Sequence, residues 1–150
     1  MIVFQHESLA GALGAMTPLV ARHWREVALD RDRVPLAPDW EKYRLLDRTG
    51  ALNITTARHD GRMVGYACYI VSRHLHYRDL MVAESDAFFL APEHRRGPEG
   101  VRLLRAAEQN VIAAGAQRIV TRVKVDPDFG PLLRRMGYQP IEAVYSKRVG

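Results

Sequence analysis

The stretch DAFFLAPEHRRGPEGVRLLRAAEQ, residues 86–109, leads from an apolar strand into an amphipathic helix through a turn rich in arginine and glycine. A tight turn at the start of a helix presents backbone N–H groups without partners inside the helix, at the positive end of the helix dipole. Gly97 and Gly100 allow a ligand to approach this backbone closely. Arg95 and Arg96 add positive charge. We therefore predict a phosphate or pyrophosphate site, although an ordinary helix start would leave the same pattern.

The segments on either side predict one series of strands and helices. Before the stretch, we expect a strand at 2–4, a helix from about 9 to 30 that Pro18 kinks or divides, a helix capped by Asp39 and ended by Gly50, paired strands at 51–57 and 63–71 around an Asp60-Gly61 turn, and a strand at 82–90. After it, we expect a helix from about 97 to Gly115, a strand at 118–125, a short helix from Asp126 to Gly137 and a strand at 141–149.

This order, β-α-α-β-β-β-α-β-α-β, indicates an α/β fold of the α+β type. We expect a mixed, mainly antiparallel central sheet flanked by helices, with one βαβ crossover. The 150 residues are 47% hydrophobic and 26% charged, which predicts one domain spanning 1–150. The single cysteine, Cys68, cannot form an internal disulfide.

The location and partners of the chain follow from its charge and apolar runs. The run 64–71 is too short to cross a bilayer, and the N-terminal residues lack the pattern of a secretion signal. We therefore expect a cytoplasmic protein without a membrane partner. The net charge of +5 suits an anionic partner, either the phosphates of a small cofactor or a nucleic acid. Charge alone does not choose between them.

The turn within 86–109 resembles the acyl-CoA-binding segment of the Gcn5-related N-acetyltransferase (GNAT) superfamily, Pro-x-x-Arg/Gln-x-x-Gly-x-Gly/Ala between a strand and a helix. Pro92, Arg95 and Gly100 match this pattern. Pro98 stands where the family usually has its middle glycine, and it has no N–H to offer a phosphate. The order of elements is also similar, and Met136-Gly137-Tyr138 resembles the family's Leu-Gly-Phe.

The resemblance implies that acetyl-CoA, or another acyl-CoA, is the co-substrate. In this superfamily, the strand before the turn separates from its neighbour, and the pantetheine arm pairs with the exposed backbone like an added strand. The residues that this assigns to the co-substrate are Phe88, Phe89, Leu90, Arg95, Arg96, Gly97, Glu99, Gly100 and Val101. No metal is expected, because no carboxylate or cysteine completes a ligand set with His74, His76 and His94.

The resemblance also implies transfer of the acyl group to a primary amine by direct attack, for which a carboxylate removes a proton. Glu84 and Asp86 alternate along one strand, so both are candidates for the general base, and Glu84 aligns with the glutamate base of some members. Both would equally fit strand-end residues in water or in ion pairs. Many members have a tyrosine acid where this chain has Leu133, which leaves Tyr138 as the candidate acid, with Tyr145 as the alternative.

The acceptor amine belongs to a small molecule or a peptide that the sequence does not identify. Because the first helices flank the acceptor cleft in this superfamily, Trp24 and Glu26 are the expected acceptor contacts. The rival function is a catalytically weak CoA-binding module, or a regulatory module that binds nucleic acid or protein, with nucleic acid the less favoured partner. A homodimer through the C-terminal strand or the helices is left open.

Overall fold

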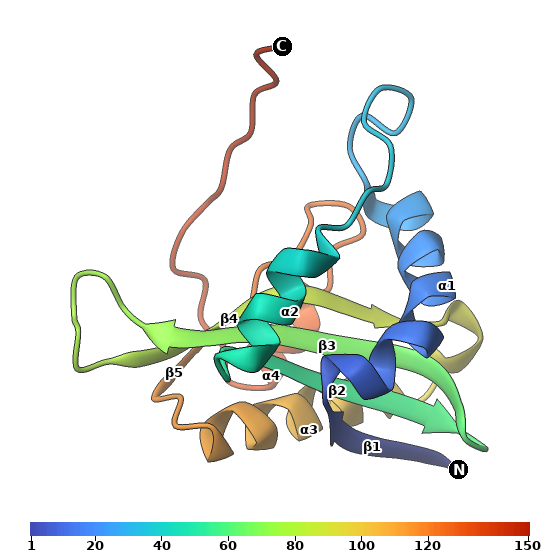
Figure 1. Ribbon diagram of the computed structural model, residues 1–150, viewed down its shortest axis with the longest axis horizontal. Coiled ribbons are helices and arrows are strands. Elements are labelled where there is room, and N and C mark those ends of the chain that lie inside the picture. The colour runs from blue at the N-terminus through green and yellow to red at the C-terminus, as the bar shows by residue number, and fades with distance from the viewer.

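Five strands form one sheet in the order β1-β2-β3-β4-β5 in the computed structural model, which describes residues 1–150 (Figure 1). The strands are β1 (Ile2–Glu7), β2 (Leu52–His59), β3 (Arg62–Arg73), β4 (Met81–Leu90) and β5 (Arg118–Val120). Neighbours are antiparallel except β4 and β5, which are parallel because a helix crosses over between them. The predicted mixed, mainly antiparallel sheet is confirmed.

Four helices and one short 3-10 turn complete the fold. They are α1 (Leu9–Val27), α2 (Trp40–Arg48), the 3-10 turn Pro92–His94, α3 (Glu99–Ala113) and α4 (Gly130–Arg135). Ser8 caps α1 by accepting from the N–H of Gly11 at 3.2 Å. Asp39 caps α2 as expected, accepting from the N–H of Lys42 at 3.0 Å.

The sheet is covered on both faces, and β3 shows how its side chains divide between them. Tyr66 and Cys68 point to the face covered by α1 and α2, whereas Ala67 and Tyr69 point to the face covered by α3. On the first face the α1 side chains Leu9, Ala12, Met16 and Leu19 are buried. On the second face the α3 side chains Leu103, Ala107 and Val111 are buried. Because β3 is buried on both sides, its side chains contribute to the core on each face of the sheet.

The boundaries of two helices differ from the sequence prediction. The first helix ends at Val27, three residues before the expected Asp30, because Ala28 turns to an extended conformation. Pro18 lies inside α1 and does not divide it. The third helix begins at Glu99, two residues after the expected start at about 97, and Pro98 occupies its N-cap position. None of the helices combines the length and hydropathy that a membrane span requires.

The C-terminal part of the prediction is wrong at three points. Residues 141–149 form no strand: they run outward from the sheet (Figure 1), and residues 139–150 are all exposed. Their β-branched and aromatic residues do not suffice, because a strand forms only where its backbone finds a partner. The fifth strand ends at Val120, and the fourth helix starts at Gly130 after a turn in which Asp128 accepts from the N–H of Gly130 at 2.8 Å.

One close contact makes the pairing of β3 with β4 dependent on a glycine. A Cβ atom at Gly65 would lie 2.7 Å from the carbonyl oxygen of Phe89 and 2.9 Å from Cδ1 of Leu90. Gly65→Ala therefore forces the two strands apart, and we expect a loss of about 1–3 kcal/mol in the free energy of unfolding. Urea denaturation measures this loss.

Gly14→Ala is the matched control, because a Cβ atom there meets nothing within 4 Å on the exposed side of α1. This variant should gain about 0.5–1 kcal/mol from the better helix propensity of alanine. Equal stability of the two variants would contradict the close packing of β3 against β4.

Candidate active site

A β-bulge in β4 sets the position of Asp86. The pairing of β3 with β4 shifts between Cys68 and Tyr69: Tyr69 pairs with Ser85 and Cys68 with Ala87, so Asp86 has no cross-strand partner. A bulge turns two successive side chains toward one side of the sheet. Accordingly, Asp86 and Ala87 both line the same cavity, on the face covered by α1 and α2.

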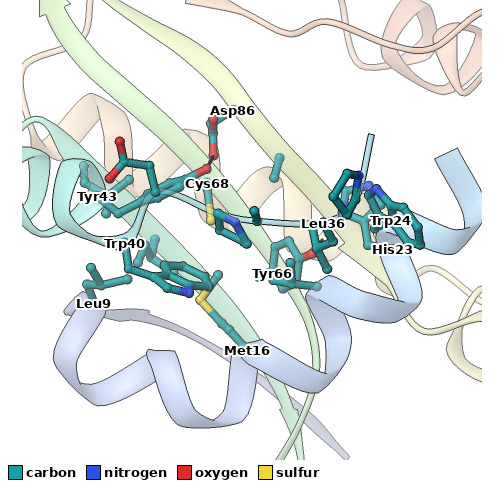
Figure 2. Close-up of a pocket in the computed structure, with 18 residues that line it drawn as sticks. Leu9, Met16, His23, Trp24, Leu36, Trp40, Tyr43, Tyr66, Cys68 and Asp86 are labelled. Atoms are coloured by element: carbon teal, nitrogen blue, oxygen red, sulfur yellow. Dashed lines mark hydrogen bonds between the residues drawn. The ribbon is translucent and has the colours of Figure 1, made fainter. Parts of the chain in front are cut away.

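This cavity has a volume of about 400 Å³ and lies between α1, the segment 35–39, α2 and the inner strands (Figure 2). Thirteen of its 18 lining residues are hydrophobic, so the walls are mainly apolar. The lining residues are Leu9, Met16, Val20, His23, Trp24, Pro35, Leu36, Ala37, Pro38, Asp39, Trp40, Tyr43, Leu52, Ile54, Tyr66, Cys68, Asp86 and Ala87. A cavity with these properties suits a small organic ligand.

Asp86 and Tyr43 form the first polar pair of the cavity. The Tyr43 hydroxyl donates to Oδ2 of Asp86 at 2.6 Å. Burial, together with this hydrogen bond, raises the pKa of Tyr43 far above its usual value, so the hydroxyl stays a donor. Oδ1 of Asp86 has no hydrogen-bond partner, and the residue is exposed at the cavity. This oxygen is therefore available to a ligand.

His23 and Tyr66 form the second polar pair. Nδ1 of His23 lies 2.9 Å from the Tyr66 hydroxyl, and the imidazole stacks on Phe89 with 5.1 Å between ring centroids. Burial lowers the pKa of His23, so the ring is neutral at neutral pH. Its Nε2 atom has no partner in the structure. The cavity thus holds a carboxylate and a neutral imidazole.

Glu84, the other predicted base, does not line this cavity. Its Oε2 atom accepts from the guanidinium of Arg122 at 2.8 Å, and its side chain is 45% exposed. The two candidate carboxylates therefore differ in surroundings: Glu84 is held by a cation, and Asp86 is held by a neutral hydroxyl.

The outer edge of β4 is open along the half that follows Glu84. Strand β5 pairs with β4 only from Val82 to Glu84, so the backbone of 85–90 has no strand partner on this side. The side chains of Phe89 and Leu90 are buried on opposite faces. Their backbone is what this edge can offer to a ligand, which fits the pantetheine arm of acyl-CoA.

The turn that follows the open edge fits a pyrophosphate. No side chain caps α3, and its first backbone bond runs from the N–H of Arg102 to Pro98 at 3.0 Å, so the N–H groups of 99–101 precede the helical ladder. A Cβ atom at Gly97 or Gly100 would meet nothing within 4 Å, so this space is open. Arg96 is exposed and forms no ion pair.

Two neighbouring charges are already paired. The guanidinium of Arg95 contacts both carboxylate oxygens of Glu26 at 2.7 and 2.8 Å, and its Nε donates to the carbonyl of Leu90 at 2.6 Å. The hydrogen bonds from Arg95 lower the pKa of Glu26. Glu99 pairs with Arg102 at 3.2 Å. Arg95 thus ties the turn to α1, and Glu26 does not reach the cavity lining.

The remaining predicted site residues lie on both sides of the sheet. Trp24 lines the cavity. Val101 is partly buried in the first turn of α3. Tyr138 lies outside the cavity and donates to Oε1 of Glu108 on α3 at 2.8 Å, while Leu133 is buried. Burial and the hydrogen bond to Glu108 raise the pKa of Tyr138. The roles assigned to these residues stay predictions.

Sequence analysis missed three polar residues of the cavity: His23, Tyr43 and Tyr66. His23 and Tyr66 stand in apolar patterns typical of core positions, which hide them. One signal was available for Tyr43, because α2 contains Trp40 and Tyr43 among many charged residues and buries none of its nine residues fully. Aromatic side chains on so polar a helix indicate a cavity wall. For Tyr66 the sequence gives no signal.

Comparison with known proteins fits this arrangement. A model of the acetyltransferase (GNAT) family matches residues 17–138. The ribosomal-protein-alanine N-acetyltransferase of Brucella melitensis biovar Abortus 2308 is similar in structure, with 17% identity, full coverage of both chains and a TM-score of 0.75. The aminoglycoside acetyltransferase HMB0005 from an uncultured soil metagenomic sample has 16% identity and a TM-score of 0.78 over 100% of this chain and 99% of that chain.

Aminoglycoside N-acetyltransferase AAC(6')-Iy in complex with CoA has 14% identity and a TM-score of 0.71, over 99% of this chain and 95% of that chain. Among curated proteins, no sequence matches the chain. These structural likenesses show the fold, and the family model covers most of the chain. The chain therefore belongs to the acetyltransferase (GNAT) family. This family uses acetyl-CoA as its acyl donor, and the resemblance recognised in the sequence is confirmed.

The lowered pKa of His23 predicts how stability depends on pH. The folded protein resists protonation of this ring, whereas the unfolded chain binds a proton near the ordinary value of 6.5. The contribution of the neutral His23 ring to the free energy of unfolding is therefore complete above about pH 6.5 and is lost as the pH falls below this value. His23→Asn places an amide at the Nδ1 position and removes the titration.

The measurement is the free energy of unfolding of wild type and variant at pH 7.5 and pH 5. We expect the advantage of the wild type to shrink at pH 5, while other titrating groups cancel in the comparison. Parallel pH profiles would show that His23 titrates alike in both states.

Proposed function

We propose that this protein is an acyltransferase that moves an acyl group from acyl-CoA to a primary amine bound in the cavity of Asp86. The observation that carries the proposal is the position of this carboxylate. Asp86 faces the cavity, and its backbone belongs to the open edge of β4, which begins at Ser85. An amine held by Asp86 would therefore lie next to a thioester held along β4.

The co-substrate supplies a thioester whose carbonyl carbon accepts the amine. The backbone of Phe88 and the N–H of Leu90 would pair with the pantetheine arm. The carbonyl of Leu90 already accepts a hydrogen bond from Arg95. The N–H groups of Gly100 and Val101, together with the unpaired Arg96, would bind the pyrophosphate. Gly97 gives the turn room to approach it.

Asp86 would then act on the acceptor. An ammonium group is attracted to the carboxylate, but only the neutral amine has the electron pair for attack, so one proton must leave. Oδ1 of Asp86, free of other partners, would take this proton directly or through a water molecule. The C–N bond forms, the C–S bond breaks, and the departing CoA thiolate takes up a proton. In the tautomer whose Nδ1–H donates to the Tyr66 hydroxyl, Nε2 of the neutral His23 would be a second proton acceptor in the same cavity.

The departing thiolate would need no dedicated acid. The usual tyrosine position holds the buried Leu133, and the Tyr138 hydroxyl donates to Glu108. A thiol is a fair leaving group, so the lack of this acid is compatible with turnover. The rival reading of a weakly active binding module gains no support, because the cavity carries a free carboxylate beside the open strand edge.

Asp86→Asn should lower kcat for acyl transfer about 100-fold, the usual contribution of a general base. The Asn side chain can still accept the hydrogen bond from Tyr43, so the fold should persist. Glu84→Gln and Tyr138→Phe are the matched comparisons and should retain kcat within a few fold. Release of free thiol measures all three. A loss confined to Glu84→Gln would move the base to Glu84.

Binding of the co-substrate is tested separately. At a concentration of 100 times Kd, acetyl-CoA should stabilise the folded protein by about 2.7 kcal/mol, seen as a higher Tm. Gly100→Asp places a side chain and a negative charge in the open space of the turn. Because aspartate is favourable in the first turn of a helix, the Tm without ligand should persist while the shift is lost. An unchanged shift would place the pyrophosphate elsewhere.

A further inference from the structure

From the charge and polarity of the cavity of Asp86, we infer that the acceptor is an arylalkylamine: one primary amine joined by a short chain to an aromatic body. The inference rests on the proposed transferase function and adds the acceptor class. It depends on which side chains line the cavity and on the hydrogen bonds they already make.

The charged groups of the lining allow for one positive charge. The only ionisable side chains there besides tyrosine and cysteine are His23, Asp39 and Asp86. The Asp39 carboxylate caps α2, and His23 is neutral because burial lowers its pKa. The charge of Asp39 lies at the positive end of the α2 dipole, whereas Asp86 is bound only by the neutral hydroxyl of Tyr43. Asp86 is thus the carboxylate whose charge is left for a ligand. A ligand with several ammonium groups would leave the others without counter-charge.

The lining also contains no lysine or arginine. An amino acid carries a carboxylate next to its amine, and this carboxylate would enter the cavity without a cation. A hydroxylated amine is disfavoured for another reason: its hydroxyl groups would lose their hydrogen bonds to water against walls that are mainly apolar. The cavity therefore disfavours amino acids, polyamines and aminosugars.

The apolar end of the cavity fits an aromatic ring. Leu9, Met16 and Trp40 lie together on the side away from the Asp86 carboxylate in Figure 2. Trp40 and Tyr43 meet at 5.5 Å between ring centroids. Aromatic faces and a methionine sulfur both pack favourably on a further ring. The volume of about 400 Å³ leaves room for a body of one or two rings.

A panel of acceptors at saturating acetyl-CoA tests the inference. The value of kcat/KM for 2-phenylethylamine and tryptamine should exceed that for phenylalanine, ethanolamine, spermidine and kanamycin by at least about 100-fold, since a missing or unpaired polar contact discriminates this strongly. A polyamine or kanamycin that equals the arylalkylamines overturns the inference and leaves the transferase function intact. If acetyl-CoA binds but no amine is acylated, the proposed function itself fails.

A binding measurement does not depend on turnover. Both tryptophans of the chain, Trp24 and Trp40, line the cavity, so intrinsic fluorescence reports its occupation. 2-Phenylethylamine should change this signal saturably, and Asp86→Asn should weaken its binding at least about tenfold because the counter-charge is lost. Spermidine should cause no saturable change. A signal change alike for both amines, or alike in wild type and variant, contradicts the inference.

The aromatic wall has its own matched variants. Trp40→Ala should raise KM for 2-phenylethylamine about tenfold or more, through the loss of aromatic packing area, and should leave KM for acetyl-CoA unchanged. Trp40→Phe should restore most of the affinity. Leu45→Ala changes an exposed side chain of the same helix outside the cavity and should change neither constant. An unaltered KM in Trp40→Ala, with Tm preserved, overturns the aromatic assignment.

Discussion

The extra residue that β4 carries opposite β3 is the constraint on which the candidate site depends. If the two strands paired without interruption, Asp86 and Ala87 would point to opposite faces, because side chains alternate along a regular strand. The bulge places both on the face of α1 and α2, where Asp86 meets Tyr43. The same strand loses its other neighbour after Glu84. One strand therefore turns a carboxylate toward the cavity and leaves its backbone unpaired at the sheet edge.

A second constraint holds the turn after β4 in place. Arg95 joins Glu26 on α1 and the carbonyl of Leu90, so the end of the strand, the turn and the wall of the cavity are linked through one guanidinium. A guanidinium that binds a carboxylate with two parallel hydrogen bonds fixes direction as well as distance. Arg95 matches the family's motif position, and here its contacts within the protein position the turn. Arg96 and the N–H groups at the start of α3 have no partner of this kind, and they are the groups that we propose for the phosphates.

The sequence predicted what depends on local patterns. The strand, turn and helix around Gly97, the Asp39 cap and the Asp60-Gly61 turn follow from propensities and from residues with special backbone freedom, and the structure contains each of them. It could not predict the bulge, because the shift at Asp86 arises from packing between two strands. Long-range packing also decides that the buried Tyr66 lines the cavity and that residues 141–149 find no strand partner, so the sequence showed neither.

The two proposed ligand sites are built by different parts of the chain, and this has a consequence for how such a protein diversifies. The cavity that we propose for the acceptor takes most of its wall from α1, the segment 35–39 and α2, whereas the elements that we propose for the co-substrate are the end of β4 and the start of α3. Asp86 and Ala87 are the only residues of β4 in the cavity. Substitutions in the two N-terminal helices can therefore reshape acceptor preference while the co-substrate elements stay as they are. The elements that can vary with the acceptor are thus separate from those proposed to bind the co-substrate, and the two groups meet at the bulge in β4.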